Sequence, residues 1–324
     1  MSYLQIPKDA ILIQEVGMRD GLQSAGKFID TEDKIRLLNR LSGHGLAKIE
    51  VTSFVSPKAV PLLADAEEVL TRIDRNPDVL YTALIPNLRG LERALNTELD
   101  EVNVVMSVSE VHNLANLRMS CADSMHQISQ IVKQSAGLSV NGTLATAFAC
   151  PFMGVTDPNQ VMEWAKRYID AGVDSLTVAD TIGAATPQQV YSLCSQITHT
   201  YPDIELTLHL HNTRGLGIAN ALAGIAAGVR RFDASFAGIG GCPYAPGATG
   251  NVCTEDLVHA LQFDGYRCDV DLQGLIETTQ MLGEVLPGNL PGLVRTSGSS
   301  DRRHPISEGV RELINQSGID RPTS

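Results

Sequence analysis

Three consecutive segments decide the fold: Glu205-Leu-Thr-Leu-His-Leu210, Leu216–Ala227 and Arg231-Phe-Asp-Ala-Ser235. The first and third are short apolar runs typical of strands, and the middle segment has the periodicity of an amphipathic helix. Gly228 follows the helical segment, at a position where glycine commonly ends a helix. A strand, a helix and a second strand in this order build a parallel sheet.

The same unit repeats along the whole chain. Strand-like runs cover Ile11–Val16, Ala47–Thr52, Leu80–Leu84, Glu101–Met106, Thr143–Ala149, Ser175–Ala179, Glu205–Leu210 and Arg231–Ser235. Helical patterns lie at Thr31–Leu41, Lys58–Ile73, Leu88–Leu95, Ser124–Ser135, Asp157–Ala171, Pro187–Thr200 and Leu216–Ala227. Eight such repeats without a linker predict an α/β fold, the closed (β/α)8 TIM barrel. We expect a single catalytic barrel domain over residues 1–285, and a C-terminal extension over 286–324 with a short helical region and a partly disordered tail.

Composition limits the classes of function. The chain has 324 residues, 43% of them hydrophobic, and a formal net charge of −12. The negative charge argues against nucleic acid or an anionic membrane as a partner. No stretch is apolar enough to span a bilayer, and the N-terminus lacks a secretory signal pattern. The six cysteines show no CxxC spacing, so we expect reduced thiols in the cytoplasm, with Cys121, Cys150 and Cys194 structural.

Polar residues gather at the C-terminal ends of the predicted strands, the face where TIM barrels form their active sites. They are Arg19, Asp20 and Gln23 after the first strand, Glu50 and Ser53 on the second, Asn87 after the third, Asp180 after the sixth, and His209 and His211 on the seventh. The loop after the eighth strand is glycine-rich and contains Cys242 and Asn251. Such a loop seldom serves packing alone.

The histidine pair indicates a metal site. His209 and His211 are two residues apart, so on a strand both imidazoles point to the same side. A His-X-His pair by itself is often accidental. Here Asp20 can meet the pair across the barrel mouth, and Asn251 can add a neutral fourth ligand. Two nitrogens and two oxygens suit Mg²⁺ or Mn²⁺, with zinc as an alternative.

Two further groups indicate catalysis. Arg19 is too polar for a barrel core, and a salt bridge with Glu50 on the next strand would explain it. The same bridge would orient the guanidinium toward an anion that develops during a reaction. The thiol of Cys242 can serve as an acid or a nucleophile near the metal. A non-catalytic metal-binding barrel remains an alternative, which Arg19 and the thiol disfavour.

The motifs resemble those of the 3-hydroxy-3-methylglutaryl-CoA lyase family. They are Arg19-Asp20-Gly-Leu-Gln23, Ile49-Glu50-Val-Thr-Ser53-Phe54-Val-Ser-Pro-Lys58, Ala179-Asp180-Thr181-Ile-Gly183, His209-Leu-His211 and Gly238-Ile-Gly-Gly-Cys242-Pro-Tyr-Ala-Pro-Gly247. The resemblance runs from about Ile11 to Leu261. The cysteine loop is specific for the lyases, whereas the Arg-Asp-Gly and His-X-His motifs are shared with condensing synthases of a wider group of metal-dependent barrels.

The resemblance implies a role for each matching residue. It implies Asp20, His209, His211 and Asn251 as metal ligands, Arg19, Asp20, Glu50, His209 and Cys242 as catalytic residues, and Gln23, Ser53, Asn87 and Asp180 as substrate-binding residues. The implied reaction is the retro-Claisen cleavage of 3-hydroxy-3-methylglutaryl-CoA to acetyl-CoA and acetoacetate, with Mg²⁺ or Mn²⁺ as cofactor. An acyl-CoA thioester is the implied partner, and a cytoplasmic homo-oligomer, a dimer or tetramer, acting in leucine degradation or ketone-body formation is the implied setting.

The sequence departs from the family at two places beside the mouth. Ser24-Ala25-Gly26 follows Gln23 where Asn-Glu is expected, and Asn212-Thr-Arg214 follows His211 where Asp-Thr is usual. Two alternatives therefore stay open. One is a lyase for another hydroxyacyl-CoA, such as citramalyl-CoA. The other is an acyltransferase that condenses an acyl-CoA with a 2-oxo acid, although about sixty residues after the last barrel loop are too few for the usual regulatory domain.

Overall fold

The computed structural model describes residues 10–241, 250–288 and 290–317. Its barrel strands are β1 (Leu12–Glu15), β2 (Lys48–Ser53), β3 (Leu80–Leu84), β4 (Glu101–Ser107), β5 (Ser139–Ala145), β8 (Ser175–Asp180), β9 (Glu205–Leu210) and β10 (Arg231–Ala234). They close in the order β1-β10-β9-β8-β5-β4-β3-β2, with every neighbouring pair parallel. The predicted (β/α)8 TIM barrel is confirmed.

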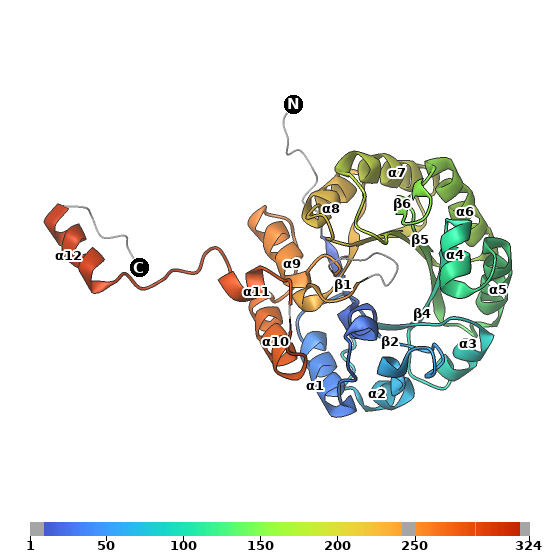
Figure 1. Cartoon of the computed structure of the whole chain (residues 1–324), viewed down its shortest axis with the longest axis horizontal. Coiled ribbons are helices and arrows are strands. Elements are labelled where there is room, and N and C mark those ends of the chain that lie inside the picture. Colours follow the sequence, from blue (N-terminus) through green and yellow to red (C-terminus); the bar gives the residue numbers. More distant parts are fainter. Residues whose placement is uncertain (1–9, 242–249, 289, 318–324) are drawn as a thin grey trace.

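Helices form a ring around the barrel (Figure 1). The helices of the described residues are α1 (Thr31–Ser42), α2 (Ala66–Arg72), α3 (Leu88–Ala94), α4 (Glu110–Leu117), α5 (Cys121–Gln134), α6 (Pro158–Ala171), α7 (Pro187–Thr200), α8 (Gly217–Ala226), α9 (Thr254–Phe263), α10 (Leu272–Val285), α11 (Val294–Ser297) and α12 (Glu308–Ser317). A small antiparallel hairpin, β6 (Ala149–Cys150) with β7 (Gly154–Val155), lies apart from the barrel sheet. Figure 1 shows α12 projecting away from the barrel.

Local sequence signals explain several helix boundaries. Thr186 precedes α7 and forms a capping box with Gln189, and Pro187 occupies the first helical position. Asp157 caps α6 by accepting a hydrogen bond from the Asn159 N–H, and the helix ends at Gly172, whose φ is 92°. Such caps satisfy backbone groups that a helix end leaves without partners.

The predicted fifth strand is wrong by four residues, because β5 covers Ser139–Ala145 instead of Thr143–Ala149. Thr146 has a φ of 56°, which ends the extended backbone before the apolar run that follows. That run enters the β6–β7 hairpin. The prediction missed the true start because Asn141 and Gly142 interrupt the apolar pattern of the strand.

Two helix predictions also need correction. The predicted helix Lys58–Ile73 contains a 3-10 turn at Pro61–Leu63, and its α-helical part is only α2. Proline at the start of that turn cannot continue a preceding helix. Helix α4 was not predicted, although Ser109 caps it by accepting from the His112 N–H at 3.4 Å. Helix α10 ends at residue 285, the predicted end of the barrel domain, and α12 lies within the predicted extension 286–324. The division into these two parts stays a prediction.

The inside of the barrel is filled by polar side chains and leaves a cavity of only about 10 Å³. At the end of the barrel where the strands begin, Lys48 Nζ donates to both carboxylate oxygens of Glu101, at 2.6 and 2.7 Å. Both side chains are more than nine-tenths buried. Among the described residues the barrel interior is therefore a packed core, and we expect the chemistry at its mouth.

Two further expectations concern the whole chain. Within the described residues no helix has the length and apolar character needed to cross a membrane. Five cysteines are described, and they are buried and free of disulfides: Cys121, Cys150, Cys194, Cys253 and Cys268. Their burial agrees with the structural role predicted for the first three.

Candidate active site

Three predicted metal ligands converge at the mouth of the barrel. Asp20 lies in the turn Gly17–Gly21 that follows β1, and His209 and His211 lie at the end of β9. One ligand atom from each residue lies within 4.8 Å of the others, and all three residues are buried. The Nε2 atoms of the two histidines are 3.3 Å apart. This cluster can hold a divalent cation.

Asp20 connects this cluster to a guanidinium through its two carboxylate oxygens. Its Oδ1 accepts hydrogen bonds from Arg19 Nη1 at 2.6 Å and Gln23 Nε2 at 3.0 Å. Its Oδ2 accepts from Asn251 Nδ2 at 2.7 Å and lies 4.0 Å from His209 Nε2. Burial alone would raise the pKa of this carboxyl, but the neighbouring guanidinium and imidazoles outweigh burial and lower it to about 2. Asp20 is therefore an anion at any physiological pH.

Asn251 reaches the cluster because the chain before α9 pairs with the end of β9. Its backbone forms an antiparallel bridge with His211, and the next residue, Val252, donates its N–H to the Leu210 carbonyl at 2.8 Å. Gly240 leaves room for the amide, since a Cβ there would lie 2.6 Å from Asn251 Nδ2. The Oδ1 of Asn251 is buried without a hydrogen-bond partner among the described residues. A buried oxygen in this condition fits a metal ligand.

Asp233 on β10 belongs to the site and was not predicted. Its Oδ2 lies 3.0 Å from His209 Nδ1, and both side chains are about 12% exposed or less. Burial lowers the pKa of His209, but the Asp233 carboxylate outweighs it, and the net shift is upward. A carboxylate on Nδ1 leaves Nε2 facing the cluster and fixes the ring orientation. The sequence signal was a single acid within a short predicted strand, and the register of β10 against β9 places it opposite His209.

The predicted salt bridge of Arg19 is confirmed and continues into the barrel. Arg19 Nε donates to Glu50 Oε2 at 2.6 Å. The other oxygen, Oε1, accepts from Asn103 Nδ2 at 3.1 Å. Asn103 Oδ1 in turn accepts from Asn141 Nδ2 at 3.0 Å and Thr143 Oγ1 at 2.8 Å. Burial raises the pKa of Glu50 despite the opposing effect of Arg19. The guanidinium is thus held from below by a chain of hydrogen bonds.

A buried acid below the mouth holds the backbone that carries Arg19 and Asp20. Glu15 Oε1 accepts from the Gly17 N–H at 2.7 Å, and its carboxylate also accepts from the Phe236 N–H and the Thr254 hydroxyl. Burial raises the pKa of Glu15 to about 8, although these donors oppose the shift. The carboxyl therefore joins the turn after β1 to the segment after β10.

The remaining predicted site residues lie at the same face with different roles. Ser53 ends β2, and its Oγ accepts from the Val55 N–H at 3.2 Å. Asn87 caps α3, since its Oδ1 accepts from the Gly90 N–H at 3.0 Å. Both side chains serve local backbone structure, and substrate binding by them stays a prediction.

Asp180 at the end of β8 is fully buried. Its two oxygens accept from the Ala184 and Ala185 N–H groups at 2.9 and 3.0 Å. Burial raises the pKa of this carboxyl, against the effect of both donors. Its substrate-binding role stays a prediction. Cys242, the predicted thiol of the loop, lies outside the described residues.

Comparison with known proteins places this geometry in a family. The HMGL-like family model matches residues 10–282. A hydroxymethylglutaryl-CoA lyase of Bacillus subtilis is 41% identical over 87% of this chain and 95% of its own. An (R)-citramalyl-CoA lyase of Chloroflexus aurantiacus is 38% identical over 90% of this chain and 95% of its own.

A solved structure of an HMG-CoA lyase has the same fold as this chain. The HMG-CoA lyase of Acinetobacter baumannii, in complex with coenzyme A and 3-methylmalate, superposes with a TM-score of 0.89. It is 44% identical and covers 94% of this chain and all of its own. With the family model matching most of the chain and relatives near 40% identity over nearly their full length, this protein belongs to the HMGL-like family of hydroxymethylglutaryl-CoA lyases.

Proposed function

We propose that this protein is a divalent-metal-dependent lyase that cleaves 3-hydroxy-3-methylglutaryl-CoA to acetyl-CoA and acetoacetate. The observation that carries the proposal is the position of Asp20 between two kinds of group. One carboxylate oxygen contacts Arg19, and the other faces His209 and Asn251. A 3-hydroxyacyl thioester has its hydroxyl and carbonyl oxygens close together in one molecule. It can therefore place one oxygen at the imidazoles and the other at the guanidinium.

Asp20, His209, His211 and Asn251 would hold the cation, which we propose to be Mg²⁺ or Mn²⁺. The oxygen ligands and the single carboxylate among the four support this choice. When bound, such a cation lowers the pKa of a hydroxyl group beside it. Asp20 and His209 both lie where they can accept the hydroxyl proton.

Arg19 would stabilise the charge that appears as the carbon–carbon bond breaks. The electrons of that bond move onto the acetyl thioester and form an enolate, whose oxygen needs a fixed donor. Glu50 holds the Arg19 guanidinium from one side and Asp20 from the other. The guanidinium is therefore oriented before the reaction, which is the condition for strong transition-state stabilisation.

Cys242 would donate the proton that converts the enolate carbon into the methyl group of acetyl-CoA. The family resemblance of the glycine-rich segment supports this part of the proposal. Cys242→Ala should keep the bound metal and lower turnover by about 10²–10⁴-fold, the range for a proton-transfer group. Normal turnover of this variant would remove the thiol from the mechanism.

Citramalyl-CoA is a second candidate substrate. The Chloroflexus relative named for that substrate spans 90% of this chain. This chain also departs from the family at Ser24-Ala25, beside Gln23, and at Asn212 in the segment Asn212-Thr-Arg214. Arg214 Nη1 donates to the Ile182 and Gly183 carbonyls at 2.9 and 3.0 Å and holds the turn after Asp180. A change in both segments can alter the acyl group that the mouth accepts.

A panel of hydroxyacyl-CoA thioesters separates the candidates. Each is incubated with the protein and Mg²⁺, and the products are identified by mass spectrometry. Acetyl-CoA with acetoacetate supports the first proposal, and acetyl-CoA with pyruvate from citramalyl-CoA supports the second. If no thioester is cleaved while acetyl-CoA and a 2-oxo acid give a condensed product, the protein is an acyltransferase.

A cytoplasmic location and a homo-oligomeric state complete the proposal. The absence of disulfides among the described cysteines supports a reducing compartment. Light scattering of the purified protein would test for the dimer or tetramer, and a monomeric mass would reject that part.

A further inference from the structure

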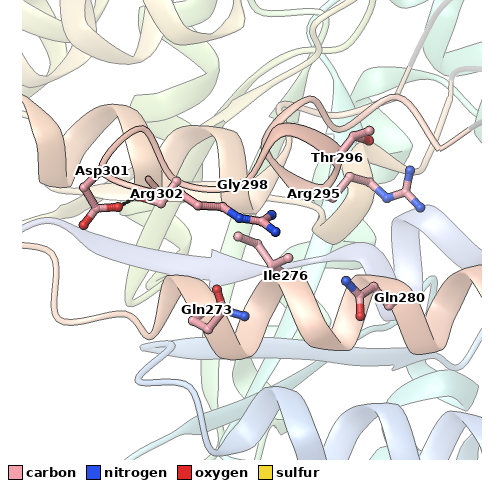
Figure 2. A pocket seen from close by; sticks show the side chains of 9 residues that line it. Gln273, Ile276, Gln280, Arg295, Thr296, Gly298, Asp301 and Arg302 are labelled. Carbon is pink, nitrogen blue, oxygen red and sulfur yellow. Dashed lines mark hydrogen bonds between the residues drawn. The ribbon is translucent and has the colours of Figure 1, made fainter. Parts of the chain in front are cut away.

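A pocket of about 530 Å³ lies between α10 on one side and α11 with the segment that follows it on the other. Most of its lining residues are polar, and they include Gln273, Gln280, Arg295, Thr296, Ser299 and Arg302. Figure 2 shows that these residues come from two sides. None of them contributes to the site at the barrel mouth.

Helix α10 provides one wall through a single face. Gln273, Ile276 and Gln280 follow one another at intervals of three and four residues, which places them on the same side of a helix. Ile276 is buried and forms an apolar floor between the two carboxamides. A carboxamide offers both a donor and an acceptor, so this wall can hydrogen-bond a polar ligand.

The opposite wall carries two guanidiniums without partners. Among the described residues neither the Arg295 nor the Arg302 side chain pairs with a carboxylate or a carbonyl, and the buried Nε of Arg295 has no hydrogen-bond acceptor. Several arginines elsewhere on the surface, among them Arg36, Arg75 and Arg267, pair with a carboxylate. Two unpaired guanidiniums facing one pocket, in a chain of net charge −12, indicate an anionic ligand.

The one acid of the pocket does not neutralise them. Asp301 accepts a hydrogen bond from Ser299 Oγ at 2.6 Å. In Figure 2 its carboxylate lies at one end of the pocket, whereas the Arg302 guanidinium points to the middle, above Ile276. Arg295 lies further along, on the side of Gln280. The two positive groups therefore lie at different places along the pocket, and a ligand with more than one anionic group can contact both.

We propose that this pocket binds a small ligand with several phosphate or carboxylate groups. Arg295 and Arg302 would bind the oxyanions, since a guanidinium pairs with either group through two parallel hydrogen bonds. Gln273, Gln280, Thr296 and Ser299 would bind the remaining polar atoms. The proposal does not depend on the reaction at the barrel mouth.

The test is isothermal titration calorimetry of the full chain with pyrophosphate and, separately, with citrate. An ionic strength of about 0.15 M screens non-specific attraction to surface charges. Saturable binding is expected for at least one probe, and the better probe distinguishes phosphate from carboxylate recognition. The same probe should raise the melting temperature, because it binds only the folded protein.

Variants assign the binding to this pocket. Arg295→Gln and Arg302→Gln should each weaken it by about tenfold or more, the usual effect of losing a charge-assisted hydrogen bond. Arg36→Gln, at an exposed arginine elsewhere, should leave it unchanged. His211→Ala should also leave it unchanged, which separates the pocket from the metal site. No saturable binding of either probe, or equal binding by the double variant Arg295→Gln/Arg302→Gln, would overturn the proposal.

Discussion

Two clusters of buried charge lie on the same strand of the barrel, and they are built differently. Lys48 on β2 forms a closed pair with Glu101, in which one cation and one carboxylate satisfy each other. Two residues further along β2, Glu50 joins Arg19 and Asp20, where acids outnumber the cation. The lower pair closes the barrel, whereas the upper cluster retains ligand atoms that a divalent cation can use.

Breaking the Lys48–Glu101 pair should lower the free energy of unfolding strongly and leave turnover almost unchanged. Lys48→Met leaves Glu101 buried without its cation, which typically costs about 3–5 kcal/mol of unfolding free energy. Urea unfolding at pH 7 measures the loss, and the double variant Lys48→Met/Glu101→Leu should recover most of it. Turnover per folded molecule should stay close to that of the unmodified protein. A large loss of turnover without a loss of stability would show that the two clusters do not differ in role.

In the cluster of Arg19, Asp20 and Glu50, we expect Arg19→Met to lower turnover. Loss of an oriented donor to a developing oxyanion lowers kcat by about 10²–10³-fold. KM should change little, because the enolate charge exists mainly near the transition state. Steady-state kinetics measure both constants, and metal analysis checks that the ion is retained. An increase in KM with an unchanged kcat would assign Arg19 to substrate binding alone.

Glu15 differs from Glu50 and Glu101, because only neutral groups donate hydrogen bonds to its buried carboxyl. Its pKa is raised by burial from 4.5 to about 8 in the folded state. The folded protein therefore binds the extra proton between these values, and stability is full below the lower value and lost as the pH rises through the upper one. At pH 8 the loss relative to pH 5 should be roughly 3 kcal/mol.

Chemical unfolding at several pH values tests this expectation. Glu15→Gln should flatten the fall in stability between pH 5 and pH 8, while Glu68→Gln on the exposed face of α2 should not. A parallel fall in Glu15→Gln and the unmodified protein would mean that another group titrates.

The smallest change in kcat is expected for Asn103, whose side chain donates a hydrogen bond to Glu50. Asn103→Ala removes the hydrogen bond to Glu50 Oε1 and leaves the Arg19–Glu50 bridge in place. We expect kcat to fall by about tenfold or less, because Asn103 acts on Arg19 only through Glu50, so that only part of the roughly 1.5–3 kcal/mol of this hydrogen bond appears in the barrier. Asn103→Ser, which keeps a short donor, should recover part of it. A change in kcat as large as that of Arg19→Met would mean that the lower support matters as much as the guanidinium.

The sequence could predict the barrel and the convergence of Asp20, His209 and His211 because both follow from the order of strands and helices and from the residues at the strand ends. Alternating strand and helix patterns indicate the barrel, and a His-X-His pair at a strand end lies on one side of it. Asp233 was missed because its contact with His209 depends on the register of β10 against β9, which no local pattern encodes. The pair Lys48–Glu101 was missed for the same reason, since it joins strands that are not adjacent.

The position of β5 shows a different limit. The apolar run after Thr146 has the composition of a strand but leaves the barrel, because the backbone turns at that residue. Asn141, inside β5, is polar because it bonds to Asn103 and Thr177 within the barrel. A polar barrel interior therefore hides a strand from a hydrophobicity pattern.

We propose that the cluster of Asp20, His209, His211 and Asn251 holds the cation on which carbon–carbon cleavage depends. The most direct measurement is the rate of acetoacetate release from 3-hydroxy-3-methylglutaryl-CoA in excess chelator, followed by addition of Mg²⁺ or Mn²⁺ in excess over the chelator. We predict no release in chelator, full recovery on addition of the ion, and no recovery in His211→Ala. A full rate in excess chelator, with no metal detected in the protein, would show that cleavage does not depend on a cation at this cluster.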